Sequence, residues 1–186
     1  SKPSGNMVID IGGGTTDIAI LSLGGIVNSS SIRIAGNAFD LDIVKYIKDK
    51  YKLLIGERTA EDIKKTIGTV FPGSRKEKME VRGRDLVTGL PHTITLNSDE
   101  VEEALRESVY TIIHCAKGIL EQTPPELSAD IIDKGIVLTG GGAMVDGFSN
   151  LLSQELKVPV FIAESPLTYV AEGTGILLDN LYLIDR

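Results

Sequence analysis

Two glycine triplets lie next to side chains that can bind a phosphorylated ligand. The first triplet, at 12–14, follows Asp10 and precedes Thr15. Glycines let a ligand come close to the backbone, and successive amide N–H groups in such a turn form a concavity that binds anions. Asp10 ends an apolar run and can hold Mg²⁺ through water, because Mg²⁺ keeps several waters in protein sites. The alternative for this stretch alone is an ordinary hairpin turn.

The second triplet, at 140–142, follows the apolar run 135–139 and precedes a predicted helix. A strand, a glycine turn and a helix in this order form a recurrent nucleotide site, although a tight turn would have the same pattern. The first triplet fits neither the dinucleotide nor the Walker A pattern: Asp17 falls where a third glycine is required, and no Gly-Lys-Ser/Thr follows. Two triplets at the ends of apolar strands favour a nucleotide site over two unrelated turns.

The elements that must position these loops follow from apolar periodicity. Runs at 6–11, 16–23 and 25–36 have short glycine-containing connectors, which predicts an antiparallel meander. Leu41, Val44, Ile47 and Tyr51 have helical spacing and predict an amphipathic helix over 37–52. A short helix follows at 56–68, with Thr59 as its N-cap. The alternating runs 79–85 and 92–97 predict a two-stranded ribbon.

The rest of the chain predicts an α/β arrangement. A long helix is predicted with Ser98 as its N-cap, and the acidic residues in its first turns suit the helix dipole. A buried strand at 135–139, a helix at 147–156, a strand at 158–162 and a last helix at 173–182 complete the order. We expect a core subdomain from 1–36 and 98–186, and a more polar inserted subdomain from 37–97.

Composition excludes several classes of function. The 186 residues are 42% hydrophobic and carry a net charge of −7, so bulk nucleic-acid binding, which needs a basic surface, is not expected. No apolar run approaches the roughly 18 residues of a membrane span, and no signal peptide is visible. The single cysteine, Cys115, has helical spacing that predicts a core position, and it indicates a reducing compartment. No Cys/His cluster predicts a metal site beyond Mg²⁺.

Longer stretches resemble a known family. "DIGGGTTDIAIL" resembles the second phosphate loop of the actin/Hsp70/sugar-kinase ATPases, and "VLTGGGAMVDGF" resembles their adenosine motif. "LLIGERTAEDIKKTIG", "VRGRDLVTGLPHTITLNSDEVEEALRE" and "TPPELSADIIDKGIVLTGGGA" closely resemble the MreB/Mbl family of bacterial actins. The resemblance implies an actin-like (ribonuclease H-like) ATPase lobe with β-β-β-α-β-α-β-α order and an inserted small α+β subdomain. It also implies the C-terminal half only, because the family's first phosphate loop, Asp-x-Gly-Thr, is absent.

The resemblance assigns roles to individual residues. The cofactors implied are ATP and Mg²⁺, with Asp10 and Thr15 as catalytic residues and Asp10 holding Mg²⁺ through water. From spacing alone, Glu61 and Lys64 would be a surface salt bridge; the resemblance places them beside the ribose and adenine. The implied nucleotide-binding residues are Gly12, Gly13, Gly14, Thr15, Glu61, Asp62, Ile63, Lys64, Gly140, Gly141, Gly142, Ala143 and Met144.

The resemblance also implies a function for the whole protein. ATP binding closes two lobes, and the closed form assembles head to tail into filaments under the membrane that direct cell-wall synthesis in rod-shaped cells. The partners implied are further copies of the protein, membrane proteins of cell-wall elongation and the inner membrane surface, reached through the other half. The protein would be cytoplasmic and membrane-associated. We expect this chain to be inactive alone, and residues 176–183 to expose an apolar face.

Three other readings remain open from the sequence. A sugar or acetate kinase half belongs to the same superfamily and would need an acceptor-binding acid elsewhere. A division or plasmid-segregation actin would share the glycine loops, although "GERTAE" argues against it. The third reading is the regulatory lobe of an Hsp70-type protein.

Overall fold

The structure is a computed structural model that describes residues 4–163. The expected last helix at 173–182 and the apolar face at 176–183 lie outside the described residues. The chain divides into two compact units. The first comprises Ser1–Gly36, Thr111–Met144 and Ser149–Arg186, and the second comprises Asn37–Tyr110 and Val145–Phe148. The second unit thus contains residues 98–110 and 145–148 in addition to the region expected to form the insert.

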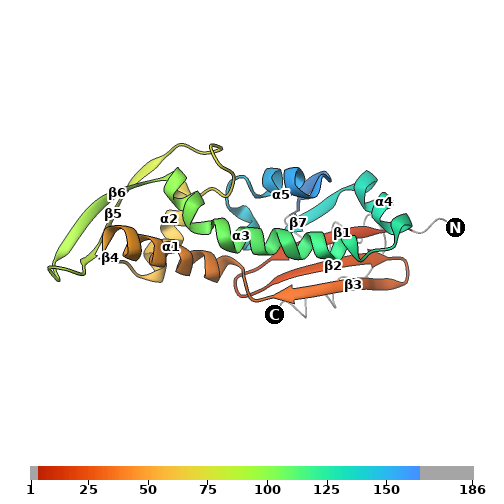
Figure 1. The fold of residues 1–186 in the computed structure, drawn as a ribbon, viewed down its shortest axis with the longest axis horizontal. Helices are drawn as coiled ribbons and strands as arrows, with labels where there is room; N and C mark the ends of the chain where they lie inside the picture. Colours follow the sequence, from red (N-terminus) through yellow and green to blue (C-terminus); the bar gives the residue numbers. More distant parts are fainter. Residues whose placement is uncertain (1–3, 164–186) are drawn as a thin grey trace. The chain divides into compact units, whose positions relative to one another are not determined.

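The first unit is built on a mixed five-stranded sheet (Figure 1). Strands β1 (Asn6–Ile11), β2 (Thr16–Ser22) and β3 (Gly25–Ile32) form the predicted antiparallel meander. Strands β7 (Ile136–Thr139) and β8 (Val160–Ile162) continue the sheet in parallel with β1. The strand order is β3-β2-β1-β7-β8, so β1 and β7 lie at its centre.

Burial along the strands reflects this order. Every residue of β1 after Asn6 is buried, as is every residue of β2 before Ser22, which is typical of central strands covered on both faces. Strand β3 is at the edge and none of its residues is fully buried. On one face Val8 lies opposite Ala19 on β2 and Val137 on β7, and these residues form an apolar cluster with Leu21.

Three helical segments connect β7 and β8 to the rest of the first unit. Helix α4 (Pro125–Lys134) precedes β7, a 3₁₀ turn (Gly141–Met144) follows β7, and helix α5 (Phe148–Leu156) precedes β8. Helix α4 was not predicted. Its carboxylate Asp130 accepts a hydrogen bond from the backbone N–H of Gly5 at 2.5 Å, which holds the helix beside the start of β1. Cys115, expected in the core, is only half-buried, with its Sγ 3.4 Å from the hydroxyl of Ser30.

The second unit combines a small antiparallel sheet with helices (Figure 1). Its sheet has the order β4-β5-β6, with β4 (Leu53–Leu54), β5 (Lys78–Asp85) and β6 (Pro91–Asn97). The predicted ribbon is β5 and β6; the third strand has only two residues and gives no alternating pattern. The helices are α1 (Gly36–Tyr51), α2 (Glu57–Ile67) and α3 (Ser98–Glu121), of which residues 98–110 belong to this unit.

Two helix details differ from the predictions. The buried side of α1 is formed by Phe39, Ile43 and Ile47, whereas Leu41 is 52% exposed. The buried apolar stripe of this helix therefore begins at Phe39 and not at Leu41 as predicted. Helix α2 begins at Glu57 with Gly56 as its N-cap, so Thr59 lies inside the helix. Its predicted end at Gly68 is confirmed, where the Gly68 N–H donates to the carbonyl of Lys64.

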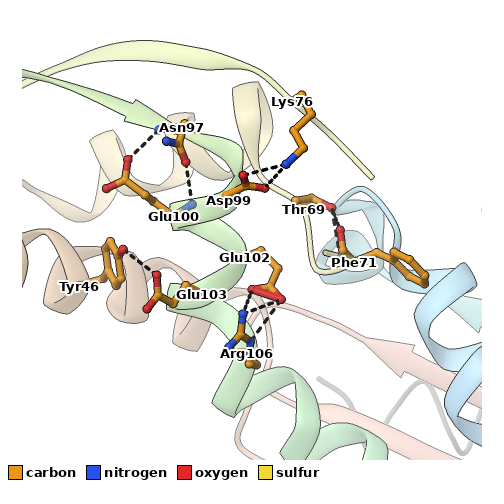
Figure 2. A network of polar contacts seen from close by, with 10 residues as sticks. All are labelled: Tyr46, Thr69, Phe71, Lys76, Asn97, Asp99, Glu100, Glu102, Glu103 and Arg106. Carbon is orange, nitrogen blue, oxygen red and sulfur yellow. Dashed lines mark hydrogen bonds and ion pairs between the residues drawn. The ribbon is translucent and has the colours of Figure 1, made fainter. Parts of the chain in front are cut away.

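Helix α3 is capped by Asn97 rather than by Ser98. The Asn97 side chain accepts a hydrogen bond from the Glu100 N–H at 2.9 Å, and the Glu100 carboxylate accepts one from the Asn97 N–H at 3.2 Å (Figure 2). This reciprocal pair is a capping box, which satisfies two backbone donors at the helix start. Ser98 instead hydrogen-bonds to the backbone of Glu77.

The same Glu100 joins α3 to α1 within the second unit. Its other carboxylate oxygen accepts hydrogen bonds from Lys50, at 2.8 Å, and from the Tyr51 hydroxyl. Burial alone would raise the pKa of the Glu100 carboxyl, but the hydrogen bonds from Lys50, Tyr51 and the Asn97 backbone together lower it. Glu100 is therefore held ionised at the junction of two helices.

Candidate functional site

The two glycine loops lie at the carboxyl ends of neighbouring parallel strands. Loop 12–15 follows β1, and loop 140–144 follows β7. From β1 the chain continues to β2 and β3 on one side of the sheet, whereas from β7 it continues to β8 on the other side. The centre of the sheet, between β1 and β7, is therefore a topological switch point. In open α/β sheets, ligands bind outside the carboxyl ends of the strands at such a point.

The first loop is a tight turn whose tip is open. The Gly12 N–H donates to the Thr15 carbonyl at 2.9 Å and closes the turn, so this amide is not available to a ligand. Gly13 and Gly14 are exposed, and within the described part of the chain their backbone amides have no hydrogen-bond partner. None of the three glycines has a positive φ. The turn therefore does not need glycine for its backbone conformation.

The second loop packs directly on the first. Gly140 has φ of 96°, and a Cβ there would lie 2.2 Å from the Ile11 carbonyl oxygen and 2.6 Å from Oδ1 of Asp10. A Cβ at Gly142 would lie 2.5 Å from the side chain of Ile11 and 3.0 Å from the Gly12 carbonyl. The two loops therefore pack closely together, and only glycine allows this approach at 140 and 142.

Two glycines have no such structural explanation. A Cβ at Gly14 or at Gly141 would meet nothing within 4 Å, and neither residue has a positive φ. Both are exposed, as is Met144, whereas Gly142 and Ala143 are buried. Gly14 and Gly141 therefore leave open the space that a side chain would fill, where a ligand could approach the backbone.

A row of buried polar residues lies beneath the loops. Asp10 on β1 is paired in register with Asp17 on β2 and with Thr139 on β7, so the three side chains share one face of the sheet. They are 4%, 1% and 2% exposed, respectively. The Thr15 hydroxyl donates to the Asp17 carboxylate at 3.2 Å. Asp17 and Thr139 were not predicted as site residues, although the hairpin register alone indicates that Asp17 faces Asp10.

These residues fit a nucleotide bound with Mg²⁺. Exposed amides of consecutive glycines bind phosphate oxygens, and two carboxylates on one sheet face attract a cation through its waters. The cation would in turn offset the repulsion between phosphates and carboxylates. Among residues 4–163, no group of three His, Cys, Asp or Glu side chains could bind a metal ion directly.

The remaining predicted site residues lie on α2 in the second unit. Glu61 pairs with Lys65 at 2.7 Å rather than with Lys64, and this hydrogen bond lowers the pKa of the Glu61 carboxyl. The surface pair of Glu61 and Lys64 considered from spacing is therefore not formed. Asp62 is exposed, but Ile63 is fully buried, so its side chain has no surface to offer a ligand.

Lys64 forms a different ion pair, which sequence reasoning missed. Its Nζ lies 2.8 Å from Oδ1 of Asp40 on α1, and the two side chains are only 11% and 12% exposed. No sequence pattern connects positions 40 and 64, because their proximity arises from the packing of α1 and α2. The ammonium is thus held in one place in the second unit.

In the part of the chain that the structure describes, no helix is long and apolar enough to cross a bilayer.

Comparisons with known proteins show the family to which the chain belongs. The family described as "MreB/Mbl protein" matches residues 1–186. The cell shape-determining protein Mbl of Bacillus cereus is 66% identical over 97% of this chain, and the cell shape-determining protein MreB of Escherichia coli is 50% identical over 97%. The chain spans about half the length of these relatives, 54% and 52% respectively.

Solved structures show the same likeness. The crystal structure of MreB5 of Spiroplasma citri bound to AMPPNP has a TM-score of 0.85 and 42% identity, and covers 98% of this chain and 55% of MreB5. The same protein has also been solved bound to ADP. The MamK double helical filament has a TM-score of 0.67 at 23% identity over 97% of this chain and 54% of MamK, which is a likeness of fold alone.

Proposed function

Because the chain belongs to the MreB/Mbl family, we propose that it is the nucleotide-binding second lobe of a bacterial actin that forms ATP-dependent filaments. This function is supported by the glycine loops at the switch point of the sheet and by MreB5, which is 42% identical and binds AMPPNP and ADP. In the whole protein, the filaments would determine cell shape, as the names of the Mbl and MreB relatives indicate.

A single observation carries the nucleotide proposal: Gly14 and Gly141 are glycines that the fold itself does not require. Each faces open space without a positive φ, and Gly141 lies between Gly140 and Gly142, which are needed for packing. Ligand approach to the backbone explains both positions together. Gly24 in the turn between β2 and β3 has the same open space, so the place of Gly14 and Gly141 at the carboxyl ends of β1 and β7 is what favours a ligand there.

Each loop has a distinct role in the proposed site. The amides of Gly13 and Gly14, with Thr15, bind the outer phosphates, and Gly141 and Met144 bind the adenosine side. Asp10 holds a water on the Mg²⁺, whose charge, when the ion is bound, stabilises the phosphate oxygens. Asp17 holds the Thr15 hydroxyl and adds negative charge under the cation site. Glu61, Asp62 and Lys64 flank the ribose and adenine.

Hydrolysis would need the part of the protein that this chain does not contain. Phosphoryl transfer depends on groups positioned around the nucleotide from all sides. The chain spans 54% of the Mbl relative, and it contains no Asp-x-Gly-Thr loop. We therefore propose that the chain alone binds ATP weakly and does not turn it over, and that the full-length protein does both.

The proposed partners follow from the same function. Head-to-tail contacts between identical subunits are heterologous and give open filaments rather than closed rings. Membrane proteins of cell-wall elongation would be further partners. The other half would provide contact with the inner membrane, so that the protein is cytoplasmic and associated with the membrane.

Calorimetric titration of Mg²⁺·ATP into the full-length protein tests the nucleotide site. Gly14→Val fills the open space beside the phosphate loop and is expected to weaken binding at least about tenfold, which corresponds to about 1.4 kcal/mol. Gly24→Val is the matched control, since Gly24 also faces open space without a positive φ, in the turn between β2 and β3. Equal affinities for the two variants would contradict the proposed site.

Sedimentation tests the filament. The full-length protein is expected to pellet when ATP and Mg²⁺ are present and to remain in the supernatant without nucleotide. Gly14→Val is expected to need a higher protein concentration to pellet, and Gly24→Val the same concentration as the unchanged protein. Pelleting that does not depend on nucleotide would contradict an ATP-dependent filament. It would not affect the conclusion that the calorimetric titration gives on nucleotide binding.

A further inference from the structure

A lysine occupies a place on the buried face of α2 where an apolar residue would be usual. Helix α2 buries Ala60, Ile63 and Ile67. Lys64 comes four residues after Ala60 and three before Ile67, so it lies on the same face of the helix. Lysine is almost never buried unless its charge is paired. Here the Nζ of Lys64 lies 2.8 Å from Oδ1 of Asp40, and the two side chains are only 11% and 12% exposed.

Asp40 has the corresponding place on α1. It comes three residues before Ile43 and seven before Ile47, both of which are buried, so it shares their face of the helix. Next to it, Phe39 is buried and its ring lies 6.0 Å from that of Phe148. All of these residues, like Lys64, belong to the second unit. The ion pair is therefore formed within one compact unit, between two helices.

Stability alone does not explain an ion pair in this place. Replacing a buried ion pair with apolar residues of similar size is often neutral or stabilising, because the cost of desolvating both charges offsets their attraction. The ion pair of Lys76 and Asp99 in the same unit is ordinary by comparison, since its side chains are 65% and 57% exposed (Figure 2). A charge kept on an apolar face of a helix points to a task beyond folding.

We propose that Asp40 is a positioning residue for the nucleotide: it touches no ligand, but holds the Lys64 ammonium ready to bind the nucleoside part. This inference rests on the function proposed above, in which Lys64 flanks the ribose and adenine. A long side chain that a ligand must immobilise costs affinity, because its rotamers are lost on binding. Asp40 restricts Lys64 before the ligand arrives and so removes much of that cost. The Lys64 side chain keeps some exposed surface, so the ammonium is not sealed inside the unit.

Calorimetric titration of Mg²⁺·ATP and Mg²⁺·ADP into single variants of the full-length protein tests the two roles. Lys64→Met removes the ammonium at similar length and is expected to weaken binding about 10- to 100-fold, as for the loss of a hydrogen bond from a charged group. Asp40→Asn removes the counter-charge and is expected to weaken binding about 2- to 12-fold, as for the ordering of one long side chain. Each loss is expected to be equal for ATP and ADP, because both contain the nucleoside part.

Lys76→Met and Asp99→Asn are the matched controls. They make the same two changes of charge at the exposed ion pair of the same unit, and both are expected to leave nucleotide binding unchanged. The sign of the Asp40→Asn effect is also informative. Removal of a negative charge favours an anionic ligand at long range, whereas the proposed positioning role predicts weaker binding.

A double variant separates positioning from stability. Asp40→Leu combined with Lys64→Met replaces the ion pair with two apolar side chains, and is expected to raise the urea midpoint above that of Asp40→Asn. Its nucleotide affinity is expected to stay as low as that of Lys64→Met alone, because Asp40 acts only through Lys64. An ion pair with a merely structural role would instead recover nucleotide affinity together with stability.

The outcomes distinguish this inference from the function on which it rests. If Lys64→Met weakens binding but Asp40→Asn binds as tightly as Asp99→Asn, Asp40 does not position the ammonium. A loss that falls on ATP and not on ADP would place the ammonium at the outer phosphate and contradict the inference. If Gly14→Val weakens binding and Lys64→Met does not, the inference fails while the glycine-loop site stands. If the unchanged protein binds no nucleotide, the proposed function fails and this inference fails with it.

Discussion

Replacing Gly140 with alanine tests whether the second loop must pack on the first. Gly140 has φ of 96°, a conformation that costs a residue with a side chain about 1–2 kcal/mol. The added Cβ would also lie 2.2 Å from the Ile11 carbonyl oxygen, and relieving such an overlap in a packed core costs about 1–3 kcal/mol. We therefore expect Gly140→Ala to lower the free energy of unfolding by about 2–5 kcal/mol, a large part of the total stability of an ordinary domain.

The neighbouring Gly141→Ala is the matched comparison, because the same methyl group there meets nothing within 4 Å. Urea unfolding of the 186-residue chain, followed by circular dichroism, is expected to show a midpoint within error of the unchanged chain for Gly141→Ala and a clearly lower midpoint for Gly140→Ala. In the full-length protein, Gly141→Ala is expected to weaken ATP binding although its stability is normal. Equal midpoints for the two variants would refute the packing argument, and unchanged ATP binding by Gly141→Ala would refute the role of the open space.

Three further predictions concern the second unit. The pKa of the Glu100 carboxyl is lowered in the folded chain from its ordinary value of 4.5. The ionised carboxylate therefore stabilises the fold at pH values above 4.5, and this stabilisation is lost as the pH falls through the lower pKa of the folded chain. Glu100→Gln should therefore lower the free energy of unfolding by about 2 kcal/mol at pH 7 and by progressively less as the pH falls below 4.5, in a series of urea titrations across this range. Asp40→Asn leaves the ammonium of Lys64 without its nearly buried counter-charge, and should lower the same free energy by about 3 kcal/mol, more than Asp99→Asn at an exposed pair; equal losses would contradict it. Asn97→Ala removes one side of the capping box and should cost about 1 kcal/mol and speed amide exchange in the first turn of α3, whereas Ser98→Ala should not affect the cap.

The sequence predicted those parts of the fold that depend on local pattern. Short glycine connectors between apolar runs were enough to predict the meander of β1, β2 and β3. Helix α4 was not predicted from the sequence, although it begins at Pro125 and proline is favoured at the first position of a helix. The cap of α3 was assigned one residue late, because Asn97 and Ser98 both favour capping and only the hydrogen bond to the Glu100 N–H decides between them.

The candidate site depended more on tertiary packing. The two triplets could be recognised from the sequence. The sequence alone does not indicate that Gly140 and Gly142 are needed for packing, whereas Gly14 and Gly141 are not. That distinction requires the distances between two strands far apart in the chain. The pairing of Lys64 with Asp40 likewise comes from the packing of two helices. The roles of Glu61 and Asp62 remain predictions carried by family resemblance.

A crystal structure of the full-length protein with AMPPNP and Mg²⁺ tests the nucleotide site most directly. We expect the outer phosphates within hydrogen-bonding distance of the Gly13 and Gly14 amides, and the adenosine beside Gly141 and Met144. A Mg²⁺-bound water should contact Asp10. A nucleotide bound away from both glycine loops, or loops that do not contact it, would contradict the proposed function.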